Sequence, residues 1–157
     1  MVNVAAPLVL EAFYDAAQAE FGTGVEVALG SFVVDPVYGY TYLGVGLSAS
    51  DESETQSMSF GQSWASVTGP SRDEEGTIRF AVLAMVGDAG NEGALAAMQA
   101  VFDIAETLGG TIREGLSIPV SVMQWTDPLM DAEFSLAQTT QGAEALLRFG
   151  IGYKARI

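Results

Sequence analysis

Two clusters of carboxylates are the residues of this chain with the most obvious chemical use. The first cluster is Asp51, Glu52 and Glu54, and the second is Asp73, Glu74 and Glu75. Paired carboxylates hydrolyse glycosidic bonds when one has a raised pKa and the two lie about 5 to 10 Å apart. A small carboxylate-based hydrolase or a ligand-binding module is therefore one hypothesis, and it requires at least two of these acids to converge in a concave pocket.

The rest of the composition argues against that chemistry. The chain has no histidine and no cysteine, which removes the commonest general base and excludes thiolate metal sites and disulfides. The acids do not follow the spacing of an EF-hand calcium loop, and no phosphate-binding loop or nucleophile elbow is present. We expect no catalytic residue, no metal and no cofactor, and we predict a protein that is not an enzyme.

The charge balance disfavours nucleic acid and membranes as tightly bound partners. The 157 residues carry 20 acidic and 6 basic side chains, a formal net charge of −14 at pH 7. Tight DNA binding needs cations that displace phosphate counterions, and an anionic membrane attracts cations too. No apolar run approaches the roughly 20 residues of a spanning helix, and residues 1–10 lack the basic n-region of a secretory signal. The negative charge itself favours solubility.

Two amphipathic helices are predicted to support these acids. The first is expected over 7–21, and the second begins at Asn91 as its N-cap and ends at Leu108, where Gly109 and Gly110 terminate it. The apolar face of the second helix is predicted to hold Leu95, Met98, Val101, Phe102, Ala105 and Leu108.

Alternating apolar residues predict strands over 25–34, 40–47, 58–64, 76–86, 120–125, 132–137 and 143–157. The first two strands are expected to be joined by a tight connection, and the last two to form a hairpin. The polar segment 48–75 includes a strand between two loops, the second loop being 69–75, and we expect it to form either an arm that packs on a neighbouring subunit or a solvated hairpin. In a single domain of residues 1–157, these elements predict an α+β fold: a mixed, mostly antiparallel sheet with two helices on one face, plus a polar insertion hairpin.

The last strand gives the chain its main concentration of positive charge. Its alternate residues from Ala143 to Ile157 are apolar, whereas Arg148, Lys154 and Arg156 face the other way, so we expect a locally positive strip. Contact between this strip on one copy and the acids of the next copy is a hypothesis. It predicts salt-sensitive self-association that Arg148→Glu abolishes.

Several short motifs, in a fixed order, resemble a known family. They are Tyr42-Leu43-Gly44-Val45-Gly46, a strand ending in Gly87-Asp88, a helix that stops at Thr107-Leu108-Gly109-Gly110-Thr111, and a hairpin from Gln138-Thr139-Thr140-Gln141-Gly142 into Tyr153-Lys154-Ala155-Arg156-Ile157. The chain thereby resembles the tail terminator proteins of long-tailed (siphovirus-type) bacteriophages.

That resemblance implies a structural role in a virion. Such proteins form a ring, a hexamer by implication, that caps the head-proximal end of the tail tube, stops its growth and joins it to the head-side connector or stopper protein. The implied partners are other copies of the chain, the tail tube protein and that connector, at the head-tail junction of a virion whose proteins are made in the host cytoplasm. A tail tube protein or a head-closure adaptor of the same virion is the alternative.

The composition is compatible with that role at two points. An acidic channel wall repels DNA phosphates, so DNA would pass through without tight binding. Copies at −14 also repel one another, so we expect the free protein to be monomeric at modest concentration. The candidate subunit-interface or channel residues are Asp51, Glu52, Glu54, Asp73, Glu74, Glu75, Arg148, Lys154 and Arg156.

Overall fold

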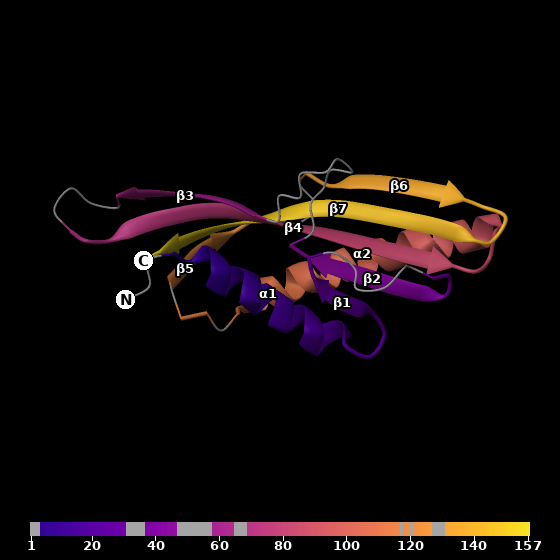
Figure 1. The fold of residues 1–157 in the computed structure, drawn as a ribbon, viewed down its shortest axis with the longest axis horizontal. Coiled ribbons are helices and arrows are strands. Elements are labelled where there is room, and N and C mark those ends of the chain that lie inside the picture. The colour runs from indigo at the N-terminus through magenta and orange to yellow at the C-terminus, as the bar shows by residue number, and fades with distance from the viewer. Residues whose placement is uncertain are drawn as a thin grey trace.

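The computed structural model describes residues 4–30, 37–46, 58–64, 69–116, 118–119, 121–126 and 131–157. Within these ranges the chain forms two helices and seven strands (Figure 1). The helices are α1 (Ala6–Phe21) and α2 (Asn91–Glu114). The strands are β1 (Glu26–Leu29), β2 (Tyr40–Val45), β3 (Met58–Trp64), β4 (Arg72–Val86), β5 (Ser121–Trp125), β6 (Glu133–Gln138) and β7 (Ala143–Arg156).

Two long antiparallel strands, β4 and β7, form the centre of one sheet. They pair along their whole length, from Asp73 opposite Arg156 to Val86 opposite Ala143. On the outer side of β4, β3 pairs with its first half and β2 with its second half. On the outer side of β7, β6 pairs with its first half and β5 with its second half. Each long strand is therefore flanked by two short strands, one at either end of the molecule.

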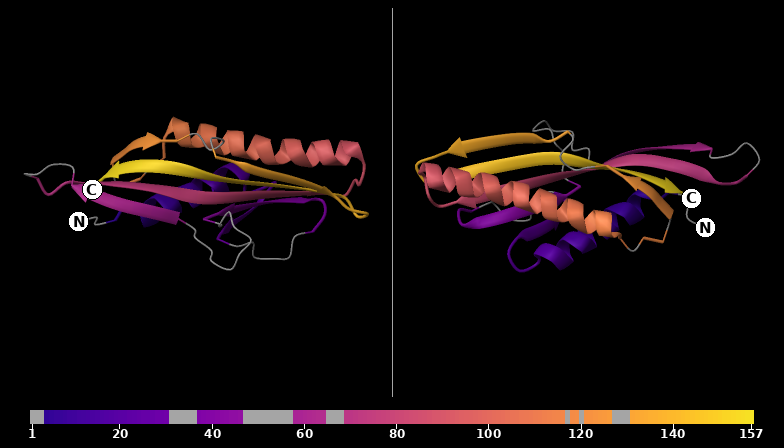
Figure 2. Two further views of the ribbon diagram at one scale, coloured as in Figure 1. Left: turned by 90° about the horizontal axis from the view of Figure 1, so that it is seen from above. Right: turned by 180° about the vertical axis from the view of Figure 1, so that it is seen from behind.

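Both helices pack on one face of this sheet, which we call the helix face; the opposite face is the open face (Figure 2). On β7 every odd-numbered residue from Ala143 to Ala155 is buried, and these residues join α1 and α2 in one core. Phe80 of β4 stacks on Phe149 of β7 at 5.2 Å between ring centroids, and Phe13 of α1 meets Phe80 edge-on at 5.5 Å. The predicted α+β fold, with two helices on one face of a mostly antiparallel sheet, is confirmed.

The insertion hairpin is present, but its acidic part is strand and not loop. β3 pairs antiparallel with β4 from Met58 opposite Ile78 to Trp64 opposite Arg72. The prediction that the strand begins at residue 76 and that 69–75 is a loop was wrong, because β4 begins at Arg72. The reason is that this segment has a strand on either side, so its backbone groups are paired in two ladders.

Helix α2 is longer than the sequence pattern predicted. Gly90, not Asn91, is its N-cap, and the helix continues through Gly109 and Gly110 to Glu114. A glycine inside a helix costs roughly 1 kcal/mol relative to alanine, but the extra turn buries Ile112 against the sheet. Burial of that side chain offsets the cost. The prediction that Leu95 lies on the buried face was also wrong, since it is exposed.

The connection between the first two strands also differs from the prediction. β1 and β2 run parallel, with Glu26 opposite Tyr42 and Leu29 opposite Val45. A tight turn cannot join parallel strands, because the chain has to return to the end from which it started. The expected tight connection is therefore wrong, and of the predicted strand 25–34 the structure assigns Glu26–Leu29, while residues 31–36 lie outside the described ranges.

Candidate functional site

One end of the sheet forms an arm, defined here as β3 together with residues 72–78 of β4. The arm extends past the helices at one end of the molecule (Figures 1 and 2). All of β3 beyond Met58 is exposed, and its helix-face positions include Phe60 at 50% and Trp64 at 69% exposure. Two large aromatic side chains thus lie at the edge of the sheet with half or more of their surface in water.

The tip of the arm also carries a positive charge. The guanidinium carbon of Arg72 lies 5.7 Å from the centroid of the Trp64 ring, within the range of a cation–π interaction. Arg72 Nη1 also donates a hydrogen bond of 3.1 Å to Oε1 of Gln62. These two contacts hold the arginine over the indole ring, so the tip presents an aromatic surface and a cation together.

Below the tip, Glu74 is fully buried on the helix face. Its Oε1 accepts a hydrogen bond of 2.7 Å from the Tyr153 hydroxyl, and its Oε2 accepts bonds from Gln62 Nε2 at 2.8 Å and from the backbone N–H of Ala5 at 3.1 Å. Ala5 is the N-cap of α1 and its own side chain cannot cap the helix. The carboxylate of Glu74 therefore supplies the negative group that a helix N-terminus favours, from 69 residues away.

Tyr153 reaches this carboxylate by crossing a glycine. A Cβ atom on Gly76 would lie 2.7 Å from Cε1 of the Tyr153 ring and 2.7 Å from the backbone oxygen of Ser59. Burial, followed by the hydrogen bond to Glu74, raises the pKa of the Tyr153 hydroxyl well above its ordinary value of 10. The hydroxyl stays protonated and donates to Glu74, so this buried group is structural in its contacts.

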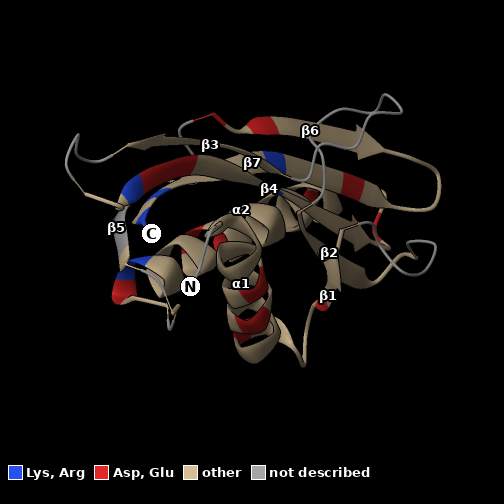
Figure 3. Ribbon diagram, turned by 60° about the vertical axis from the view of Figure 1, so that its left-hand side comes forward, with Lys and Arg blue, Asp and Glu red and all other residues tan. Residues whose placement is uncertain are grey.

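On the open face, the other two acids of the second cluster form ion pairs within the chain. Arg156 Nε donates to Asp73 Oδ1 at 2.9 Å, and Lys154 Nζ lies 2.7 Å from Glu75 Oε1. The hydrogen bond from Arg156 lowers the pKa of Asp73, and the bond to Glu75 raises the pKa of Lys154. Figure 3 shows the acidic start of β4 beside the basic end of β7.

These contacts change the interpretation of the basic strip. The expected positive strip is, at the arm end, a two-strand band of alternating sign, because each cation lies opposite an acid. Arg148, the third predicted cation, lies further along β7, opposite Glu133 of β6. Asp73 and Glu75 are therefore already paired within their own chain. A contact between the basic strip of one copy and the acids of the next copy would not have to involve these two residues.

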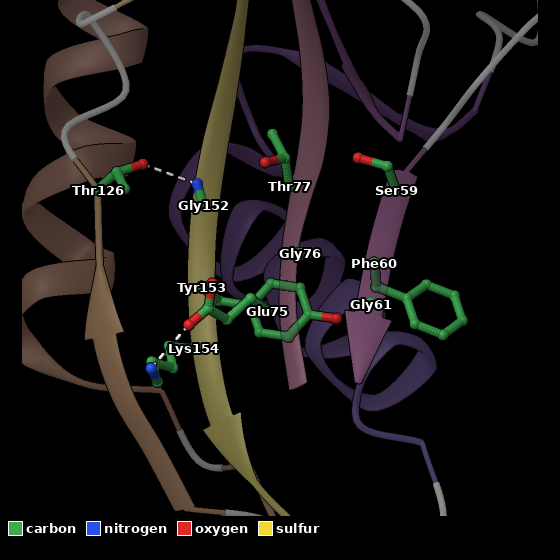
Figure 4. Close-up of a pocket in the computed structure, with 10 residues that line it drawn as sticks. All are labelled: Ser59, Phe60, Gly61, Glu75, Gly76, Thr77, Thr126, Gly152, Tyr153 and Lys154. Atoms are coloured by element: carbon green, nitrogen blue, oxygen red, sulfur yellow. Dashed lines mark hydrogen bonds and ion pairs between the residues drawn. The ribbon is translucent and has the colours of Figure 1, made fainter. Parts of the chain in front are cut away.

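A shallow depression of about 520 Å³ lies on the open face beside these ion pairs (Figure 4). Ser59, Thr77 and the Glu75–Lys154 pair line it, and Thr126 Oγ1 accepts a hydrogen bond of 2.7 Å from Gly152 N. Glu74 faces the opposite side of the sheet, so the three acids of the cluster do not converge here. The depression holds one carboxylate, and that carboxylate is paired with a lysine.

A second exposed apolar surface lies at the far end of the sheet, and we call it the β6–α2 patch. It consists of Phe134 and Leu136 of β6, 39% and 44% exposed, and of Leu95 and Phe102 of α2. The rings of Phe102 and Phe134 are 5.2 Å apart. Gln138 Nε2 donates to the backbone oxygen of Ala89, which aligns β6 with the start of α2.

Asp51, Glu52 and Glu54 lie outside the described residues. Among the residues that the structure does describe, no three acidic, histidine or cysteine side chains gather as metal ligands would. In the same residues, neither helix combines the length and the apolarity that crossing a membrane requires.

No profile of a known protein family matches the chain, and no curated protein matches it in sequence.

Sequence reasoning missed the residues that distinguish the arm. Phe60 and Trp64 were predicted as strand residues and not as a surface, although their period-two spacing was visible. The same period could have predicted that Glu74 lies on a different face of the sheet from Asp73 and Glu75. Glu74 shares its face with Ile78, whereas Asp73 and Glu75 lie on the opposite face. The cap that Glu74 places on α1 left no signal in the local sequence.

Proposed function

We propose that this chain is a structural subunit of a bacteriophage virion that assembles into a ring, caps the head-proximal end of the tail tube and joins it to the head-side connector. The observation that carries the proposal is the arm, which extends past the helices (Figure 1) and whose aromatic side chains stay half or more exposed. Large exposed aromatic residues at a sheet edge are typical of a contact with another protein chain. Tail terminators are the family that the motifs of the sequence resemble.

A second feature supports assembly from several copies. The arm and the β6–α2 patch lie at opposite ends of the sheet, so the chain carries two separate apolar surfaces. A subunit of a cyclic ring contacts two neighbours through two different surfaces, whereas a twofold dimer uses one surface twice. A net charge of −14 suits a channel through which DNA slides, since anionic walls repel phosphate. No catalytic role is part of this proposal.

Tail tubes assembled from the tube protein encoded in the same genome provide the test. The purified chain is added to growing tubes, and tube length and end structure are measured by negative-stain electron microscopy. The proposal predicts that one end of each tube gains a cap and that elongation stops there. Lengthened tubes would indicate a tail tube protein instead, and binding to heads without binding to tubes would indicate a head-closure adaptor.

Self-association offers an independent measurement on the chain alone. Because copies repel one another, we expect monomers in dilute low-salt buffer and oligomers when salt and protein concentration rise. Sedimentation velocity at low and high salt measures this. A stable ring in dilute low-salt buffer would contradict the expected repulsion, and turnover of a small molecule would contradict the structural role itself.

A further inference from the structure

Two short strands form outer edges of the described sheet at its opposite ends. Among the described strands, β3 pairs with β4 and has no second partner, and β6 pairs in the same way with β7. Both strands are exposed over nearly their whole length. An edge strand presents a row of unpaired N–H and C=O groups and readily pairs with a strand of another chain.

The two edges are offset in a complementary way. β3 lies beside residues 72–78 of β4, and β2 takes over at Phe80, so the edge on this side has a step. On the other side, β6 lies beside residues 143–148 of β7, and β5 follows near its end. When a second copy is shifted along the strand direction by the offset between β3 and β6, its β6 lies against β3 of the first.

Strand direction agrees with this placement. β3 runs antiparallel to β4, β4 antiparallel to β7, and β7 antiparallel to β6. β3 and β6 consequently run in opposite directions in one subunit. Two copies whose strands run the same way and whose helix faces lie on the same side therefore bring β3 of one against β6 of the other as an antiparallel pair, and a rotation between neighbours about an axis close to the strand direction keeps this pairing in a closed ring.

The apolar side chains also fall on matching faces. Phe60 and Trp64 lie on the helix face of β3, and Phe134 and Leu136 lie opposite Leu147 and Ala145 on the helix face of β6. In the joined sheet both rows lie on one side. The four residue steps from Phe60 to Trp64 span about 13 Å of strand, which is similar to the roughly 10 Å of helix between Leu95 and Phe102.

The charges around the two surfaces are of opposite sign. The arm carries Arg72 over Trp64, and the rim of the β6–α2 patch carries, on α2, the exposed acids Asp103 and Glu106, one and four residues after Phe102. An arginine that approaches this rim meets carboxylates, which favours this pairing over one between like surfaces.

We propose that β3 of one copy pairs antiparallel with β6 of the next copy, and that Phe60 and Trp64 thereby cover the β6–α2 patch. The inference rests on the proposed function, since it identifies the contact by which the ring would close. The occupant of the arm is a second copy of this chain. Pairing of β3 with β3 would leave the β6–α2 patch uncovered and would stop at a dimer.

The absence of cysteine from the whole chain makes cross-linking a direct test. Ser63→Cys places a thiol on the open face of β3, and Ser135→Cys places one on the open face of β6. The double variant is treated with a short bismaleimide at high protein concentration and high salt, and the products are separated by denaturing electrophoresis. β3 and β6 lie at opposite ends of one subunit, so a link between them joins two copies (Figure 1).

The expected result is a ladder of covalent oligomers in the double variant and none above background in either single variant. Adding Trp64→Asp to the double variant is expected to lower the yield at least tenfold, while an unchanged unfolding temperature shows that the fold is intact. A matched control pairs Ser63→Cys with Glu11→Cys on the exposed side of α1, and it is expected to give no ladder.

Each other outcome overturns a defined part of the argument. Dimers in the Ser63→Cys single variant would establish β3 with β3 pairing and overturn the inference, and so would the absence of a ladder in the double variant. Rings or capped tubes without mixed cross-links would overturn the strand pairing and leave the proposed function standing. Mixed cross-links in open filaments that never cap tubes would support the pairing and overturn the proposed function.

Discussion

The two halves of β4 are one continuous strand, but they have different surroundings. In the second half, the helix-face residues Phe80, Val82 and Ala84 are fully buried beneath the helices. In the first half, the same face carries Arg72, Glu74 and Gly76, and the neighbouring strand β3 is exposed. The apolar half builds the core of the subunit, whereas the polar half pairs with β3, whose outer edge is open to another chain.

The buried carboxylate of Glu74 lies within the polar half of β4. Glu74 is as inaccessible as the core phenylalanines, yet three hydrogen bonds from β3, β7 and the start of α1 satisfy it. A buried charge is tolerated when donors surround it in this way. The difference teaches that the arm is fixed to the body by polar contacts, so its aromatic side chains remain available for contact.

The largest difference in stability is expected when a phenylalanine is replaced by alanine in the apolar half of β4 and in the arm. Phe80→Ala should lower the free energy of unfolding by about 3 to 5 kcal/mol, because it leaves a cavity in the core. Phe60→Ala in the arm should lower it by less than about 1 kcal/mol, since half of that ring is already exposed. Urea unfolding measures both, and equal losses would contradict the comparison.

The contacts of the polar half can be tested with two adjacent acids. Glu74→Ala should cost about 2 to 3 kcal/mol, because it leaves the Tyr153 hydroxyl and the Ala5 N–H buried without their acceptor. Glu75→Ala is the matched control one position away, where the side chain is exposed on the open face, and it should leave the urea midpoint nearly unchanged. A larger effect at Glu75 than at Glu74 would refute the assigned roles.

A smaller difference is expected between two glycines of the arm. Gly76→Ala should cost about 1 to 2 kcal/mol, because the new methyl group meets the Tyr153 ring and the backbone of Ser59. Nothing lies within 4 Å of a Cβ placed on Gly61, so Gly61→Ala should be neutral or slightly stabilising. Thermal unfolding of the two variants measures the difference, and a stable Gly76→Ala variant would show that Tyr153 can move aside.

The smallest effect concerns pH. Arg156 lowers the pKa of Asp73 in the folded state below its ordinary value of 3.8, so the folded state favours the carboxylate. The resulting stability is present above that ordinary value and is lost as the pH falls through the lowered pKa. Asp73→Asn should therefore flatten a small part of the decline in stability below about pH 4. Urea midpoints of the two proteins between pH 5 and pH 2 measure it; parallel profiles would contradict a role for this pair.

Local patterns were sufficient for most of the fold. The alternation from Ala143 to Ile157 predicted the buried face of β7, and the period of α1 predicted its extent to Phe21. The local pattern gave the wrong element where contacts with distant segments stabilise a conformation that the local sequence alone does not predict. Burial of Ile112 extends α2 past two glycines, and strands on either side of Asp73 convert an expected loop into strand.

The candidate surfaces were only partly predictable. Arg148, Lys154 and Arg156 were correctly placed on the outer face of β7, because period two alone decides that. Their partners were not predictable, since Asp73 and Arg156 are 83 residues apart. Leu95 was assigned to the core, yet its side of the helix lies next to an edge strand that does not cover it.

The sequence by itself determined the fold class, the buried and exposed sides of the long strands, and a charge of −14, because residue periodicity and composition are local or additive properties. Only the tertiary structure decided that Glu74 is buried as the cap of a distant helix, that β1 and β2 are parallel, and that Phe60 and Trp64 stay exposed. These features depend on which distant segments are in contact. Strand order and register decide those contacts, and the local sequence pattern does not.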